Sequence, residues 1–157
     1  MKNFVYFIEF VIIIIFFLIF RIIGYKAASN FGFFIGKVFG PKFRSKKTIV
    51  DNIRNYKSSL KNNEIEIIIK KMWGNYGRIL AEYPYVSSFR KKRLEKYIDI
   101  EGRENLEKIK KTGKPVVFIS GHFSNFELMA MIIEREGIEL SAVYRPLNNK
   151  FLNVIME

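Results

Sequence analysis

The residues best suited to chemistry lie in one short segment, ISGHFSNFE, residues 119–127. Its histidine, His122, is the only histidine of the chain, and the carboxylate of Glu127 follows five residues later. Such a pair suits general base catalysis, because the carboxylate orients the ring and stabilises its cationic form while the other ring nitrogen takes a proton from a substrate hydroxyl. Five helical steps would leave the two side chains about 140° apart. The pair can therefore meet only if His122 lies on a turn and Glu127 on the first turn of the following helix.

Structural explanations of the same residues compete with catalysis. Residues 124–127 spell S-x-x-E, the pattern of a helix capping box, which would give Glu127 a role in helix stability alone. A single histidine is also often structural. Serine hydrolase chemistry is disfavoured, because the chain has no G-x-S-x-G sequence and no second histidine to serve Ser120 or Ser124.

The elements around this segment predict how its residues are positioned. Three apolar segments are predicted to be strands and two amphipathic segments between them to be helices: strands 97–102, 115–120 and 138–144, helices 103–113 and 127–134. This alternation is typical of an α/β fold with a parallel or mixed sheet. His122 and Arg145 each follow a predicted strand, so both are expected at the carboxyl edge of the sheet, where catalytic groups of such folds lie. Backbone N–H groups at the start of the helix after His122 would suit an oxyanion or a phosphate.

The N-terminus predicts a membrane anchor. Residues 4–23 form a run of twenty residues interrupted only by Glu9 and Arg21, about 30 Å long as a helix, which matches the hydrocarbon thickness of a bilayer. A cleaved signal peptide is the alternative, because small residues follow at 27–29. Basic residues gather on one side of the span, and the positive-inside rule then places the rest of the chain in the cytoplasm. These residues are Arg21, Lys26, Lys37, Lys42, Arg44, Lys46 and Lys47.

Two parts are therefore expected, a single-pass anchor at 1–26 and a cytoplasmic domain at 27–157. Within the second part, residues 30–40 (NFGFFIGKVFG) suit either a segment lying in the membrane interface or a segment packed into the core. Apolar residues at helical spacing then predict helices over 49–60 and 65–80, with Pro84 ending the second.

The composition limits the classes of molecule that the chain is expected to bind. The chain has 27 Lys and Arg against 15 Asp and Glu, a net charge of +12, which suits nucleic acid, an acidic membrane surface or a phosphorylated substrate. No nucleic-acid-binding motif is present, and the membrane span argues against that class. The absence of cysteine excludes disulfides and thiol chemistry, and one histidine leaves no zinc-ligand set. A basic run at 88–97 suits a solvated surface or a docking site for an acidic protein or anionic lipid.

The segment GHFSNFEL resembles the active-site motif of the bacterial lipid A biosynthesis acyltransferase family, the lauroyl and myristoyl transferases. Further segments are similar to blocks of that family in the same order: MWGNYGRILAEYP at 72–84, IEGRENL at 100–106, GKPVVFISGHF at 113–123 and VYRPLNN at 143–149. With the N-terminal anchor, the likeness covers the whole chain. It implies an N-terminal transmembrane helix followed by helices and a partial sheet of the His-x4-Glu acyltransferase type.

The resemblance also implies a reaction and its participants. A fatty acyl group passes from acyl carrier protein to a hydroxyl of a phosphorylated glucosamine lipid, the lipid A precursor, at the cytoplasmic face of the inner membrane. His122 would be the general base and Glu127 its charge partner, Arg145 would bind a phosphate or the oxyanion, and Asn125 would shape the turn. Direct attack of the acceptor hydroxyl on the thioester needs no enzyme nucleophile, metal or cofactor.

Other interpretations remain open at this point. Chains of the family are much longer, so residues 27–157 are expected to be the N-terminal part of an incomplete domain, either a fragment, a truncated product or half of a split enzyme. An acyltransferase of the wider His-x4-acid class, acting on another glycolipid or on glycerol phosphate, would use His122 in the same way. A truncated, inactive membrane protein that docks partners through its basic surface is the other alternative.

Overall fold

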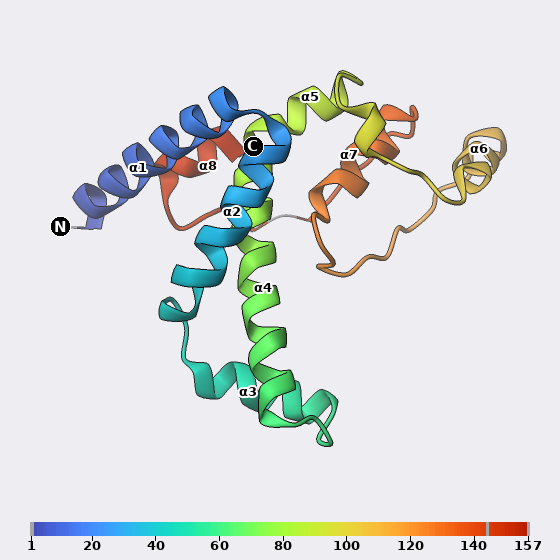
Figure 1. The fold of residues 1–157 in the computed structure, drawn as a ribbon. Helices are drawn as coiled ribbons and strands as arrows, with labels where there is room; N and C mark the ends of the chain where they lie inside the picture. Colours follow the sequence, from blue (N-terminus) through green and yellow to red (C-terminus); the bar gives the residue numbers. More distant parts are fainter. Residues whose placement is uncertain (1, 144, 157) are drawn as a thin grey trace. The chain divides into compact units, whose positions relative to one another are not determined.

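The computed structural model describes residues 2–143 and 145–156, and this part of the chain is built from helices joined by loops (Figure 1). Tyr144, the last residue of the third predicted strand, and the outermost residues of the two predicted domains, Met1 and Glu157, lie outside the described residues. In chain order the elements are α1 (Lys2–Ile23), α2 (Tyr25–Phe39), η1 (Gly40–Lys42), α3 (Lys46–Tyr56), α4 (Asn62–Glu82), η2 (Tyr83–Tyr85), α5 (Val86–Arg90), η3 (Glu95–Tyr97), α6 (Arg103–Thr112), α7 (Glu127–Arg135) and α8 (Lys150–Met156).

The predicted α/β fold with a partial parallel or mixed sheet is wrong for this structure, since residues 2–143 and 145–156 contain no strand. The two predicted helices are present as α6 and α7, but the segments predicted as strands run without regular structure. β-propensity expresses how well side chains fit a half-buried pleated surface, and strands form only where neighbours pair their N–H and C=O groups. Here Val117 is 88% exposed and Ile119 is 92% exposed. Apolar side chains of strand type are present, but the surface that they would pack against is absent.

The chain folds into two compact units: Ile14–Pro84, and the residues up to Ile13 together with those from Tyr85 onward. The predicted boundary after residue 26 stays a prediction. In the Ile14–Pro84 unit, α2 and α4 lie side by side in close contact. Glycines at 32, 36 and 40 allow this approach, because a Cβ at Gly36 would lie 2.9 Å from the Cα of Gly77. The Ser29 hydroxyl donates a 2.7 Å hydrogen bond to Glu82 Oε1 within this buried contact.

The far end of α4 packs against α3. A small core forms from Ile49 of α3 with Ile65 and Ile69 of α4, each at most 7% exposed. The start of α4 is fixed by its own side chains, since the Glu64 carboxylate accepts a 2.7 Å hydrogen bond from the Lys61 N–H. The helices predicted over 49–60 and 65–80 are present as α3 and α4, although α3 ends at Tyr56 and residues 57–60 are not helical.

The other unit has its own buried residues. Phe89 of α5 is fully buried, α5 packs on α7, and Met131 and Ile133 of α7 are buried as well. Arg135 lies almost buried beside them, with its guanidinium 3.5 Å from the Phe89 carbonyl oxygen and 3.3 Å from a Glu95 carboxylate oxygen. The Glu95 carboxylate therefore compensates the buried positive charge.

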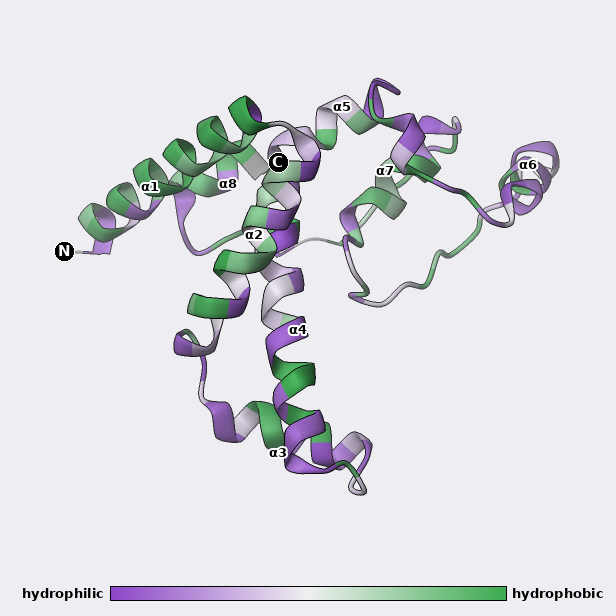
Figure 2. Ribbon diagram, in the orientation of Figure 1, coloured by the Kyte–Doolittle hydropathy of each residue, from purple (hydrophilic) through white to green (hydrophobic). Residues whose placement is uncertain are grey.

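The first helix carries the longest apolar surface. α1 has 22 residues, its most apolar 18-residue stretch has a mean hydropathy of 2.7, and it is long and apolar enough to cross a membrane. Figure 2 shows hydrophobic residues along nearly all of α1. Gly24, with a positive φ of 81° and an extended ψ of 159°, separates α1 from α2, and only glycine adopts this conformation without steric cost.

Candidate functional site

The segment before α7 holds the predicted base and its predicted partner. His122 lies in the loop, Glu127 is the first residue of α7, and both side chains are exposed. This is the arrangement that the spacing requires if the two side chains are to meet. The loop is bent tightly: the Phe123 N–H donates a 2.8 Å hydrogen bond to the Gly121 carbonyl, and Ser124 has a positive φ of 46°. A non-glycine residue in that region is uncommon and costs backbone energy.

The imidazole packs against an aromatic ring. The rings of His122 and Phe126 meet edge to face, with centroids 4.3 Å apart and an interplanar angle of 65°. Within the described chain, His122 makes neither a hydrogen bond nor an ion pair with Glu127. The structure therefore brings the two residues to the same turn but holds the imidazole against Phe126.

The capping box proposed for residues 124–127 does not form. α7 begins at Glu127, its N-cap residue is Phe126, and no side chain caps the helix. Glu127 is thus the first helical residue instead of the third, the position from which a capping-box carboxylate reaches back. Its carboxylate is left exposed at the helix N-terminus, where the helix dipole favours negative charge.

The other two predicted site residues differ in position. Asn125 is half-buried in the turn, and its carbonyl accepts a 3.2 Å hydrogen bond from the Leu128 N–H, so its backbone forms part of the turn that leads into α7. Arg145 is exposed in the segment between α7 and α8, and it makes no hydrogen bond or ion pair with any described residue. No contact joins Arg145 to His122 or Glu127 within the part of the chain that the structure describes.

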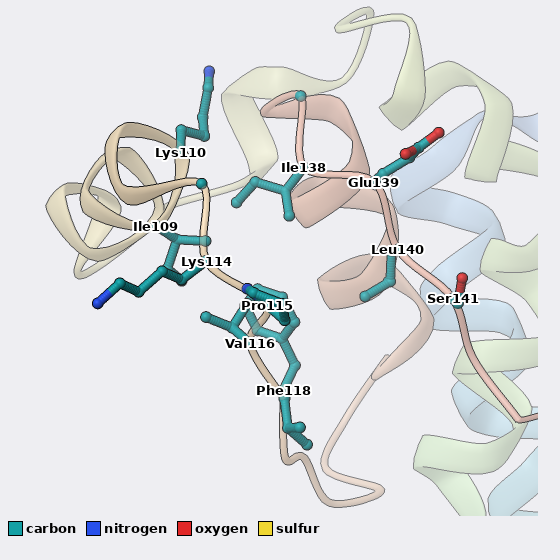
Figure 3. A pocket seen from close by; sticks show the side chains of 13 residues that line it. Ile109, Lys110, Lys114, Pro115, Val116, Phe118, Ile138, Glu139, Leu140 and Ser141 are labelled. Atoms are coloured by element: carbon teal, nitrogen blue, oxygen red, sulfur yellow. The ribbon is translucent and has the colours of Figure 1, made fainter.

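An open pocket of about 670 Å³ separates the two segments predicted as neighbouring strands. It lies between residues 109–118 and 137–141 (Figure 3). Figure 3 shows Val116 and Phe118 on one side, and Ile138 and Leu140 on the other. Paired strands lie only about 4.8 Å apart. The apolar side chains that would be expected inside a sheet therefore line an open space beside the segment that carries His122.

The hydrogen bond between Asn149 and Glu9, in the unit that contains α7 and α8, was not predicted from the sequence. The Asn149 Nδ2 donates to Glu9 Oε2 of α1 at 3.1 Å and to the Tyr6 carbonyl at 2.9 Å, while Asn149 Oδ1 accepts hydrogen bonds at the start of α8. Glu9 interrupts the apolar run of α1, and an ionisable residue in such a run is itself a signal of a specific partner. Its partner, however, lies 140 residues away in sequence and no local pattern identifies it.

The model of a family described as bacterial lipid A biosynthesis acyltransferase matches residues 1–157. No curated protein and no solved structure matches the chain. No three His, Asp or Glu side chains come together as ligands for a metal ion among residues 2–143 and 145–156.

Proposed function

This chain belongs to the bacterial lipid A biosynthesis acyltransferase family, and on that premise we propose that it transfers a fatty acyl group from acyl carrier protein to a hydroxyl of a lipid A precursor. The reaction takes place at the cytoplasmic face of the inner membrane, with α1 as the membrane anchor. The length and hydropathy of α1 support the anchor, and the basic residues that follow it support the orientation.

The proposed chemical step uses the two residues at the start of α7. The acceptor hydroxyl oxygen attacks the thioester carbonyl carbon while His122 accepts the hydroxyl proton. The tetrahedral intermediate then expels the thiolate of the carrier, and the imidazolium returns the proton to the sulfur. Glu127 stabilises the imidazolium between these two events. In this mechanism the His122 ring turns from Phe126 toward Glu127 when substrate is bound, since catalytic hydrogen bonds commonly tighten only in the substrate complex.

The observation that carries the proposal is the placement of His122 in the loop and Glu127 at the first position of α7. Both side chains are open to solvent and hence to a substrate. The failure of the capping box to form supports a role for the Glu127 carboxylate other than helix capping. Arg145 is assigned to a phosphate of the acceptor, because a guanidinium binds phosphate through two parallel hydrogen bonds.

The test measures acyl transfer by the purified full chain in phospholipid–detergent micelles, with acyl carrier protein thioester as donor and a phosphorylated glucosamine lipid as acceptor. We expect His122→Ala to lower the rate about 10²- to 10⁴-fold, as loss of a general base does. Glu127→Gln should also lower the rate severely while leaving the circular dichroism spectrum unchanged. Glu139→Gln, which neutralises another exposed carboxylate, is the matched control and should retain the parent rate.

Three outcomes would contradict all or part of the proposal. Equal rates in the parent, His122→Ala and Glu127→Gln would remove both residues from the reaction. Absence of transfer by the parent chain with every acceptor would favour the inactive membrane protein. Transfer to glycerol phosphate in place of the glucosamine lipid would keep the His122 chemistry and replace the proposed acceptor with that of the wider acyltransferase class.

A further inference from the structure

The two faces of α2 differ in what covers them. One face, with Gly32 and Gly36, packs against α4. The opposite face carries apolar side chains four, three and four residues apart, which places them in one stripe along the helix. The members of this stripe are Ala27, Phe31, Phe34 and Val38. Phe31 is 43% exposed, Phe34 60% and Val38 46%, so each large side chain of the stripe keeps a large part of its surface open.

This stripe continues the apolar surface of α1. Gly24 is the only residue between the two helices, and the rings of Phe20 and Phe31 meet edge to face with centroids 6.4 Å apart. On the α1 side of this contact, Leu18 and Ile22 are exposed as well. A helix long and apolar enough to cross a membrane thus passes directly into a second helix whose outer face is apolar.

The charged residues from Arg21 to Lys47 are all basic. No acidic residue occurs between Glu9 and Asp51. Lys26 and Lys37 lie beside the stripe on α2, and more basic residues follow α2 at Lys42, Arg44, Lys46 and Lys47. Lys46 is paired with Glu66. Lys42 lies over the ring of Phe39 at 5.5 Å from its centroid, and Phe43 beside it is 80% exposed. Aromatic and basic side chains together are typical of the headgroup region of a bilayer.

We propose that the α2 stripe lies in the surface of an anionic bilayer, with its apolar side chains among the acyl chains and the surrounding lysines and Arg44 among the phosphates. A helix of this kind rests about 5–10 Å into the boundary between headgroups and acyl chains. A second copy of the chain suits this face poorly, because a symmetric contact would bring like charges together. The proposal rests on α1 as a membrane anchor and is independent of the acyl-transfer chemistry.

The absence of cysteine makes a direct test possible, since one cysteine can be introduced at a time for a spin label. The labelled positions are Phe34→Cys in the stripe, Ile15→Cys in α1, and Lys71→Cys at an exposed position of α4. All three side chains are exposed, so their replacement removes little packing. The full chain is placed in vesicles of phosphatidylethanolamine and phosphatidylglycerol, and collisions of each label with oxygen and with a water-soluble nickel chelate are measured by electron paramagnetic resonance.

We expect the label at 34 to collide preferentially with oxygen, at a shallower depth than the label at 15, while the label at 71 collides mainly with the nickel chelate. Replacing phosphatidylglycerol with phosphatidylcholine should return the label at 34 toward water and leave the label at 15 unchanged. The combined variant Lys37→Gln, Lys42→Gln, Arg44→Gln and Lys47→Gln should have the same effect in anionic vesicles.

Three results would overturn the proposal, and each has a distinct signature. Nickel collisions at 34 equal to those at 71, with 15 protected, would leave the anchor intact and place the stripe in water. Exclusion of both reagents at 34, with spin–spin broadening that disappears on dilution by unlabelled chain, would show that a second copy covers the stripe. Nickel access at both 34 and 15 would remove the anchor on which the proposal rests.

Discussion

The α2–α4 pair and the segment around His122 are held in opposite ways. In the helix pair, glycines bring two backbones together and the Ser29–Glu82 hydrogen bond lies buried between them. Around His122, apolar residues such as Ile119 face solvent and the loop backbone has few partners within the described chain. In the α2–α4 pair, packing and hydrogen bonding are satisfied between two neighbouring helices. The segment around His122 has residues that favour strands, but they form no sheet in the described chain. Stability and candidate chemistry therefore lie in different parts of this chain.

The largest expected effect comes from the small core between α3 and α4. Ile69→Ala should lower the free energy of unfolding by about 2–5 kcal/mol, because it removes a side chain that is only 3% exposed. Ile119→Ala makes the same chemical change at a side chain 92% exposed and should change stability by less than about 0.5 kcal/mol. Denaturant unfolding followed by circular dichroism measures both. Equal losses would show that the segment before His122 is packed in solution, and the contrast between the two regions would fail.

The next effect tests the close approach of α2 and α4. A Cβ at Gly36 would meet the backbone of Gly77, so Gly36→Ala should cost about 1–3 kcal/mol, offset in part by about 1 kcal/mol of better helix propensity. Ala27→Leu adds more atoms on the exposed face of the same helix and serves as the control. Trp73, the only tryptophan, lies against Gly40, so its fluorescence reports this contact directly. An unchanged unfolding midpoint for Gly36→Ala would mean that α2 and α4 lie further apart in solution than in this structure.

A smaller effect is expected at the buried hydrogen bond of the same pair. Ser29→Ala removes the hydroxyl that donates to the Glu82 carboxylate and should cost about 1–2 kcal/mol, since bonds to charged groups are stronger than neutral ones. Ser87→Ala, at an exposed serine of α5, provides the comparison and should be nearly neutral. The unfolding midpoint of each variant gives the difference. If Ser29→Ala left the unfolding midpoint unchanged, the stability of the helix pair would come from packing at the glycines alone.

The smallest effect on folding is expected at Arg145, together with a loss of activity smaller than that of His122→Ala. Arg145→Lys replaces an exposed side chain and should change stability by less than about 0.5 kcal/mol. If the guanidinium grips a phosphate, transfer to the phosphorylated acceptor should fall about tenfold, the equivalent of one charge-assisted hydrogen bond. Rates with phosphorylated and dephosphorylated acceptors distinguish this role from that of a turn residue. Equal rates for variant and parent with both acceptors would remove Arg145 from the site.

The helices could be predicted because their signals are local. Apolar spacing identified α3 and α4, and Gly113, with φ +60°, ends α6 where the sequence places a helix stop. The sheet could not be predicted correctly from the same kind of signal. Residues 115–120 favour extended backbone, but strand pairing depends on neighbours that a local pattern does not specify. For 30–40 the sequence left two alternatives, an interface segment or core packing. The structure gives α2 a face against α4 and an exposed face.

The candidate site was predictable in position but not in geometry. Spacing alone required His122 on a turn and Glu127 at a helix start, and the structure has both there. The contact of the imidazole with Phe126 depends on the torsion angles of one loop, including the positive φ of Ser124, and no spacing rule specifies it. The roles of His122, Glu127, Asn125 and Arg145 in acyl transfer stay predictions.

The exposed segment before His122 also affects the tendency of the protein to aggregate in the cell. Val116, Val117, Phe118 and Ile119 form a short uncharged run of high β-propensity whose backbone pairs with no other described residue. Such a run can stack into cross-β fibrils and can be bound by holdase chaperones. Lys114 and Pro115 immediately precede it, and a charge and a proline at such a border act as gatekeepers against stacking. Replacing both Lys114 and Pro115 should make the chain aggregate sooner at high expression, even if its folding stability is unchanged.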